Sequence, residues 1–267
     1  MKTEDFNEEL YKACKNGKTE LAGQLIYRGA NVNAANEDGW TALKVASLNG
    51  RTETVKLLID KGADVNAVNK YGSTALMLAS EYEKTEIVKL LIDKGADVNA
   101  ANTFGETPLI LTCRNSSFRN GHLEIAKLLI EAGANVNAAD EDGRTASIWA
   151  SKNDYTELEK LFKSMEDLEK ELIEACKNGK TELAKLLIDN GTNVNAADED
   201  GRTALIWASK YRHVRIAKLL IEAGVDVNAV DEDGWTALMW ASEYGRTVLV
   251  KLLIEAGADL NASDEDG

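Results

Sequence analysis

The sequence predicts an all-α solenoid of about eight stacked helix pairs with seven extended, β-hairpin-like fingers, and two recurring glycines carry this prediction. The first opens GADVNA or a close variant, at Gly29, Gly62, Gly95, Gly133, Gly191, Gly224 and Gly257, in steps of 33, 33, 38, 58, 33 and 33 residues. The second marks a turn before T-A-L or its variants and repeats at Gly39, Gly72, Gly105, Gly143, Gly201, Gly234 and Gly267. Such regular self-similarity is typical of a solenoid, because no single unit can bury its apolar face alone.

Residues 38–70 show how one unit is expected to fold. Thr41 begins a short helix that an Asn-Gly dipeptide ends. A second helix is predicted from residue 52 to about 61, because its apolar residues are dense enough to be buried on nearly every side. Gly62 stops this helix in the left-handed conformation that glycine tolerates, and an extended finger follows.

These units resemble ankyrin repeats, whose repeat of about 33 residues carries T-P-L-H-x-A, then G-H, then a run ending in G-A-D-V-N. The resemblance spans nearly the whole chain, although proline is present only at Pro108. Where the family has its first histidine, this chain has other residues, which we expect to replace a polar network by apolar packing: Lys44, Met77, Ile110, Ile148, Ile206 and Met239. His122 and His213 fall on the G-H position and are expected to start helices.

The repeat pattern predicts two arrays. Residues 1–166 contain a cap-like unit and four repeats, with a loop insertion in the fourth unit and no finger after the fifth. Residues 167–267 begin with a second cap-like unit, because the A-C-K-N-G-K-T-E-L of residues 13–21 recurs at 175–183, and they end without an obvious cap.

The junction of the two arrays allows two interpretations. We favour a tight turn around Ser164–Asp167 within an uninterrupted stack, which keeps the apolar faces of both arrays covered. Alternatively, an apolar stripe without glycine or proline from Tyr155 to Asn178 forms one continuous helix that divides the solenoid.

Two further irregularities concern a loop and the end of the chain. The loop between Cys113 and His122 is five residues longer than its counterparts and contains Arg114 and Phe118, which is an unusual composition for an acidic protein. Binding residues are often found on loops of rigid scaffolds. Residues 264–267 open another repeat, so the array either is cut there or stacks end to end on another molecule.

Composition excludes several classes of partner. The net charge of −14 argues against nucleic acid, which needs a basic surface, and against an anionic membrane. It favours a protein or peptide partner with apolar and basic character. There is no apolar run of the roughly 18 residues that span a membrane, and no signal peptide. Three scattered cysteines predict neither disulfides nor a zinc site, so we expect a cytoplasmic protein, with a monomer as the default state.

No enzyme chemistry can be assembled from the sequence. The two Gly-Lys-Thr segments lack the earlier glycine of a phosphate-binding loop, and the D-E-D-G turns lack the final glutamate of a calcium loop. We therefore predict no catalytic residues, no metal site and no cofactor.

The resemblance implies a concave binding surface made of finger tips and first helices. Aromatic residues, which are over-represented in binding hot spots, gather at these positions. The predicted partner-binding residues are Trp40, Tyr71, Tyr82, Phe104, Arg114 and Phe118 in a first cluster with its loop, and Tyr211, Trp235 and Tyr244 in a second. Trp149, Trp207 and Trp240 match an apolar repeat position and are expected in the core.

The sequence thus predicts a protein–protein interaction scaffold or adaptor. The alternative is a structural or engineered repeat protein without a specific partner, possibly one that associates end to end.

Overall fold

The computed structural model describes residues 3–115 and 121–263. Within that range the chain forms fifteen α-helices and four isolated antiparallel β-bridges, which confirms the predicted all-α solenoid. The helices are α1 (Thr3–Lys15), α2 (Thr19–Tyr27), α3 (Ala42–Leu48), α4 (Thr52–Asp60), α5 (Ala75–Glu81), α6 (Thr85–Asp93), α7 (Pro108–Arg114), α8 (His122–Glu131), α9 (Ala146–Lys152), α10 (Thr156–Lys177), α11 (Thr181–Asp189), α12 (Ala204–Lys210), α13 (Val214–Glu222), α14 (Ala237–Glu243) and α15 (Thr247–Glu255).

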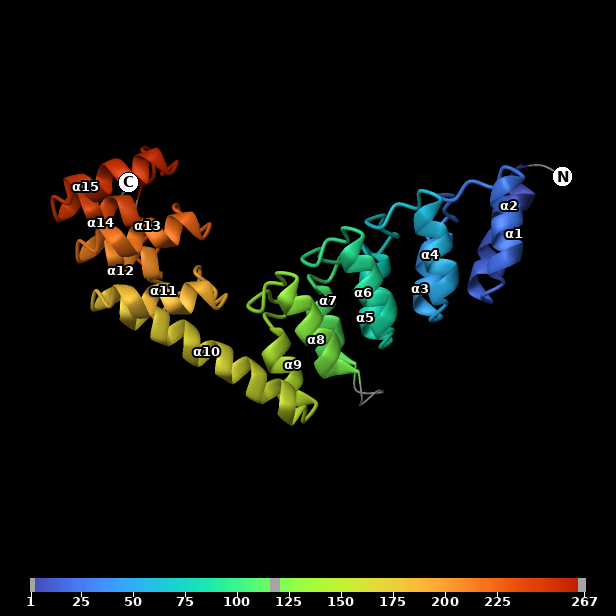
Figure 1. Ribbon diagram of the computed structural model, residues 1–267, viewed down its shortest axis with the longest axis horizontal. Coiled ribbons are helices and arrows are strands. Elements are labelled where there is room, and N and C mark those ends of the chain that lie inside the picture. The colour runs from blue at the N-terminus through green and yellow to red at the C-terminus, as the bar shows by residue number, and fades with distance from the viewer. Residues whose placement is uncertain (1–2, 116–120, 264–267) are drawn as a thin grey trace. The chain divides into compact units, whose positions relative to one another are not determined.

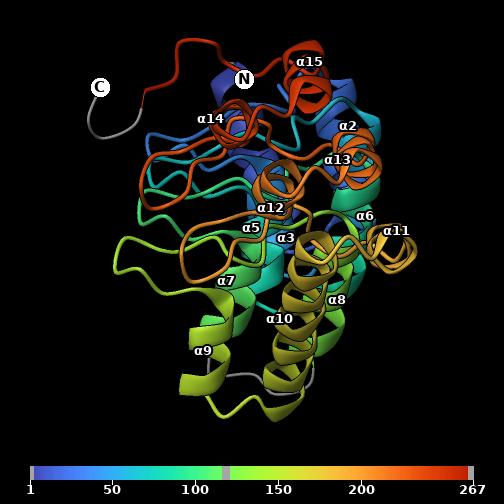
Figure 2. The ribbon, with the colours of Figure 1, turned by 90° about the vertical axis from the view of Figure 1, so that its left-hand side faces the viewer.

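The helices group into two compact units, Met1–Phe162 and Lys163–Gly267. In the first unit, α3, α5, α7 and α9 follow one another in contact, and α4, α6 and α8 form a second row (Figure 1). In the second unit, α12 contacts α14 on the side from which the fingers project, and α13 and α15 form the other row (Figure 2). The boundary between these two compact units lies inside α10, and so does the predicted boundary between residues 166 and 167.

A threonine cap starts each first helix that follows a finger. Thr41 is extended, and its hydroxyl accepts a hydrogen bond from the Lys44 backbone N–H at 3.3 Å, which satisfies one of the unpaired donors of the first turn. The same cap recurs at Thr74, Thr107, Thr145, Thr203 and Thr236. Pro108 occupies the first turn of α7, where its missing N–H costs nothing.

Glycine ends the second helices. In α4, the N–H of Gly62 donates to the carbonyl of Ile59 and the N–H of Ala63 donates to the carbonyl of Leu58, both at 2.9 Å. This is the Schellman arrangement, and Gly62 adopts the positive φ of 85° that it requires. The chain therefore leaves each second helix in the same direction and enters a finger.

The six fingers whose turns lie within the described residues each fold back in a tight hairpin turn. In the first, the Asn36 N–H donates to the Trp40 carbonyl at 3.1 Å, and the tip is joined to the next finger by a bond from the Lys70 N–H to the Asp38 carbonyl at 3.0 Å. A side chain at Gly39 would place its Cβ 2.8 Å from the Asn69 Cα, so this close approach of two fingers requires glycine.

Asparagine side chains also join successive fingers. The Asn66 amide donates to the Gly95 carbonyl at 3.1 Å, and its oxygen accepts from the Asp97 N–H at 2.9 Å. Asn33 and Asn99 make the same pair of bonds in the first unit, and Asn228 does so in the second. We call this set the asparagine ladder.

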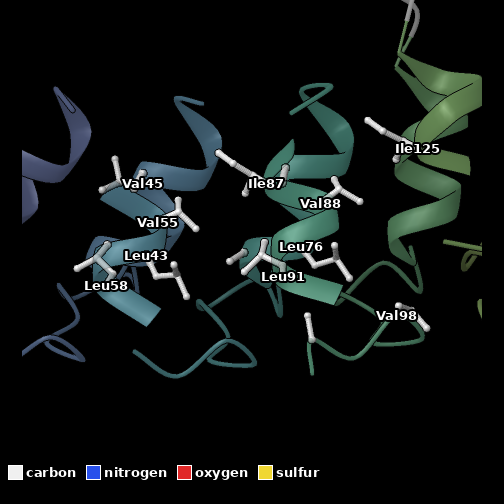
Figure 3. Close-up of a cluster of buried hydrophobic side chains, with 14 of the residues drawn as sticks. Leu43, Val45, Val55, Leu58, Leu76, Ile87, Val88, Leu91, Val98 and Ile125 are labelled. Carbon is white, nitrogen blue, oxygen red and sulfur yellow. The ribbon is translucent and has the colours of Figure 1, made fainter. Parts of the chain in front are cut away.

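The core of each unit lies between its two rows of helices. Figure 3 shows part of the first core, where Leu43 and Leu76 of the first helices face Leu58 and Leu91 of the second helices. At the position of the family's first histidine, Met77, Ile110 and Ile206 are fully buried, as expected, whereas Ile148 is 48% exposed. Lys44 is buried at this position as well, although it carries an amine.

The favoured interpretation of the junction is wrong. Residues 156–177 form the single helix α10, without a turn at Ser164–Asp167 (Figure 1). The same helix serves both cores, since Leu158 and Phe162 pack in the first and Leu172 and Cys176 pack in the second. Helix formation pairs the backbone groups in the interior of this stretch, and no glycine or proline is present to interrupt it.

Two expectations lie outside the described residues. Phe118 belongs to residues 116–120, and the expected opening of another repeat belongs to residues 264–267. Over residues 3–115 and 121–263, none of the helices combines the length and apolar character needed to cross a bilayer.

Candidate functional site

Three of the predicted rings meet at one cavity in the first unit. The cavity has a volume of about 300 Å³, and its wall includes Trp40, Tyr71 and Phe104 from three successive repeats. Trp40 follows the turn glycine of its finger, and Tyr71 and Phe104 precede the turn glycines of theirs. The Tyr71 and Phe104 side chains remain about half exposed, at 47% and 53%. Met77, Leu78 and Leu111 of α5 and α7 form the apolar floor. The spacing of the repeat thus brings residues 33 or 31 positions apart in sequence into one cavity.

Two carboxylates and one guanidinium set the charge of this cavity. Arg114, at the end of α7, donates to Glu106 at 2.5 Å and to Glu81 at 3.2 Å. Glu106 is buried, and its second oxygen accepts from the Asn102 amide at 2.8 Å. Arg114 therefore ties the finger to α5 and α7, which stiffens the cavity wall. Two acids against one base leave the wall with a formal charge of −1.

The finger tips above the cavity also carry an ion pair. The Lys70 amine lies 2.5 Å from the Asp38 carboxylate and 5.0 Å from the centre of the Tyr71 ring. Because both partners are about half exposed, this pair contributes little to stability. It does hold the Lys70 amine over the Tyr71 ring, which allows a cation–π contact.

Tyr82 does not line this cavity. It caps the C-terminus of α5 and is 37% exposed. The structure therefore groups Trp40, Tyr71, Phe104 and Arg114, and it places Tyr82 apart from them.

The second predicted cluster is held together by two tryptophans that were assigned to the core. In the second unit, Tyr211 stacks on Trp207 with a centroid distance of 5.7 Å, and Tyr244 stacks on Trp240 at 6.0 Å. Trp235 lies 5.0 Å from Trp240 and also lines a cavity of about 470 Å³ at the last finger. The three predicted residues thus belong to two aromatic groups, one with Trp207 and one with Trp240, and the Lys210 amine lies over both tryptophans.

Burial of the tryptophan row is confirmed at Trp207 only, which is 6% exposed. Trp149 and Trp240 are half-buried and pack against the edges of the two cores, so core contact is confirmed for them but full burial is not. Trp149 and Trp240 lie on the last first helix of their unit, α9 or α14, whereas α12, which carries Trp207, packs against α14. In all three tryptophans the indole N–H needs an acceptor. It donates to a finger aspartate nine residues earlier, as in Trp240 to Asp231 at 2.8 Å. The same bond joins Trp149 to Asp140 and Trp207 to Asp198.

A signal for this arrangement is present in the sequence. Units with aspartate at the first finger-turn position have tryptophan nine residues later, at Asp140, Asp198 and Asp231. Units with asparagine there have an aliphatic residue instead, as in Asn36 with Val45, Asn69 with Leu78, and Asn102 with Leu111. This pairing within the chain would have placed the tryptophans against the fingers.

Electrostatics support the Asp140 contact. Burial alone would raise the pKa of Asp140, but the N–H groups of Arg144, Trp149 and Asp142 donate to the carboxylate and together hold its pKa below the ordinary value. The guanidinium of Arg144 adds to this effect. Asp140 therefore remains an ionised anchor between finger and first helix.

A larger cavity, of about 550 Å³, lies away from the rings at the turns between helices. His122 and Leu123 of α8 line it together with residues 153–158. His122 starts α8 and His213 caps α13, as predicted. The buried His122 ring contacts the Glu83 carboxylate through Nδ1 and lies 2.6 Å from the Tyr155 hydroxyl through Nε2. These contacts connect three neighbouring repeats, and both ring nitrogens of His122 are engaged in them.

Within residues 3–115 and 121–263, no group of three or more His, Cys, Asp or Glu side chains is placed to hold a metal ion. The cysteines Cys14, Cys113 and Cys176 are free and buried, and burial raises the pKa of each thiol to about 12. At neutral pH they are therefore protonated apolar residues, without the thiolate that reaction would need.

Comparison with known proteins agrees with the geometry. The family model for ankyrin repeats (3 copies) matches residues 10–102, 98–170 and 172–264. No curated protein matches the chain. The matched segments cover almost the whole sequence, with the helix pairs, fingers and glycine turns described above. The chain therefore belongs to the ankyrin-repeat family.

Proposed function

We propose that the protein is a scaffold or adaptor that binds a protein or peptide partner on the face formed by its fingers and first helices. Ankyrin repeats are generally protein–protein interaction modules. The observation that carries the proposal is the cavity in the first unit that is lined by Trp40, Tyr71 and Phe104 from three successive repeats. Exposed rings around an apolar floor are typical of binding hot spots.

The charges suggest the character of the partner. Glu81 and Glu106 outnumber Arg114 at the cavity, and acidic tips such as Glu37 and Asp38 lie beside it. A segment that places an apolar side chain in the cavity and basic groups at its rim would complement this surface. The free, buried cysteines fit a reducing compartment, so the proposal includes a cytoplasmic location. It also includes a monomeric state and no catalytic activity.

The test is capture of a partner from cell lysate with the intact chain and with a Trp40→Ala, Tyr71→Ala, Phe104→Ala triple variant. We expect the variant to bind the captured partner at least about thirtyfold more weakly, because one hot-spot ring contributes about 2 kcal/mol or more. Tyr27→Ala is the matched control, since this ring is 94% exposed and does not line the cavity.

Circular dichroism and thermal unfolding must show that the triple variant keeps its helices. Equal retention by the triple variant and the intact chain would exclude this cavity as the binding site. Absence of any captured partner would favour the alternative of a repeat protein without a specific target.

A further inference from the structure

The second unit carries an unusual row of cations between its tryptophans. The Lys177 amine lies 4.7 Å from the centre of the Trp207 ring, and the Lys210 amine lies 5.3 Å from the same ring and 3.8 Å from Trp240. The Arg202 guanidinium lies 5.3 Å from Trp207 and 5.5 Å from Trp240. We call these five residues the cation–tryptophan ladder. Lys177 is the last residue of α10, Arg202 lies in the finger turn before α12, Trp207 and Lys210 lie on α12, and Trp240 lies on α14.

Two of the three cations lack an anionic partner. Arg202 is paired with Asp200 at 2.8 Å and reaches Asp231 at 3.5 Å. Over the described residues, by contrast, no carboxylate lies within 4.0 Å of the amines of Lys177 and Lys210. The position of these two amines is what distinguishes them, because both lie over tryptophan rings rather than beside carboxylates.

The position of Lys210 has an electrostatic cost. Partial burial lowers the pKa of Lys210, and the neighbouring positive charge of Arg202 lowers it further. The charges of Asp231 and Asp200 act in the opposite direction, and cation–π contact offsets a further part of this cost, but the pKa of Lys210 still lies below its ordinary value. An external anion above the ladder would further stabilise the charged form of Lys210.

The surroundings restrict what this anion can be. Tyr211 and Tyr244, each 46% exposed, stack on the two tryptophans and extend the ladder with apolar surface. The finger tips at its rim are acidic, at Glu199, Asp200, Glu232 and Asp233. The surface is therefore positive and aromatic at its floor and negative at its rim.

We propose that the cation–tryptophan ladder binds an acidic peptide segment of a protein partner, with carboxylates over Lys177 and Lys210 and an adjacent aromatic or apolar side chain against Tyr211 and Tyr244. Charge complementarity favours this occupant over a nucleic acid. A peptide can place acids at the floor and neutral or basic residues at the rim, whereas every phosphate of a nucleic acid is negative and would be repelled there. This site is in the second unit and does not depend on the cavity proposed in the first.

The test is selection of binders from a random-peptide display library on the intact, immobilised chain, followed by affinity measurement of the enriched peptides. We expect enriched peptides with Asp or Glu next to an aromatic or apolar residue. Their affinity should fall about tenfold or more with the double variant Lys177→Gln, Lys210→Gln, and it should weaken with added salt. Gln keeps the length and polarity of the side chains but removes the charge.

Lys185→Gln, Lys218→Gln is the matched control, because it removes the same charge from exposed lysines of α11 and α13 in the same unit. The triple variant of the first unit should leave binding of the acidic peptides unchanged, which separates the two proposed sites. Selection of peptides without acids, no enrichment at all, or equal affinity in both double variants would overturn the proposal. Binding of an oligothymidylate that depends on Lys177 and Lys210, without binding of acidic peptides, would do so in favour of nucleic acid.

Discussion

Lys44 is a buried residue whose charge lowers the stability of the fold. Its side chain is 1% exposed, and its amine donates a single hydrogen bond, to the Gly39 carbonyl at 3.3 Å. An ammonium has three N–H donors, so this environment disfavours the charged form. Burial lowers the pKa of Lys44 to about 8, although the nearby charge of Asp64 acts in the opposite direction. Met77 and Met239 occupy the same position in two other units without this cost.

We therefore expect Lys44→Met to raise the free energy of unfolding by about 3 kcal/mol at pH 7, since each unit of pKa difference corresponds to about 1.4 kcal/mol. Because the pKa is lower in the folded state, the unfolded chain binds more protons above pH 8. The Lys44 contribution to stability should rise from pH 8 toward the ordinary lysine pKa of 10.5. The three buried thiols act in the opposite direction above about pH 9, because their pKa is raised to about 12 in both proteins. The effect of Lys44 is therefore the stability difference between Lys44→Met and the native protein, which should shrink from pH 8 to 10.5. Urea unfolding across this range measures both effects.

Lys61→Met, at an exposed lysine after α4, is the control and should change stability little. An unchanged or lower stability of Lys44→Met at pH 7 would show that the amine has better partners than the Gly39 carbonyl.

Among the helices, α10 is the one for which the sequence could not decide between one continuous helix and two helices joined by a turn. The apolar stripe from Leu158 to Ala175 suits either two helices that meet at a turn or one helix with two buried ends. Local propensity is equal for both, so the choice depends on how each end packs, which periodicity cannot reveal. The short helices posed no such problem, because Thr41 and its equivalents mark the start and glycines such as Gly62 mark the end.

A proline in the middle of α10 tests its continuity. Ser164 is exposed, so Ser164→Pro changes the backbone without disturbing a core. In a continuous helix the substitution removes one hydrogen bond and introduces a clash, and we expect a loss of about 3 kcal/mol or more. Ser164→Ala, which favours helix, should be neutral or slightly stabilising. Thermal unfolding followed by circular dichroism compares the two, and tolerance of proline would instead support a turn.

The same limit applies to the candidate site. Repeat spacing was enough to predict that Trp40, Tyr71 and Phe104 come together, because equivalent positions of stacked units are neighbours. It was insufficient for Trp149 and Trp240, which lie on the last first helix of each unit and bond a finger aspartate, because apolar periodicity reveals neither feature. Arg114 was expected to face a partner, and its two ion pairs with Glu81 and Glu106 arise from units that only the fold brings together.

At the scale of the whole molecule, a repeat protein is stabilised by its units and by the contacts between neighbours. The asparagine ladder supplies part of the second contribution, because each rung joins one finger to the next. Asn66 bonds both the Gly95 carbonyl and the Asp97 N–H. Asn137 occupies the equivalent place in its finger, but the sequence has no finger in the unit that follows.

These two asparagines form a matched pair for measuring the coupling. Asn66→Ala removes two bonds between fingers, each contributing about 0.5–1.5 kcal/mol, so we expect a loss of about 1–3 kcal/mol. Asn137→Ala removes the same side chain without a rung and should cost less than about 0.5 kcal/mol. Hydrogen exchange in the Asn66→Ala variant should accelerate at the Asp97 N–H, which loses its acceptor. Equal losses in the two variants would mean that the asparagine acts within its own finger, and the coupling between units would then rest on the apolar core and the backbone bonds between finger tips.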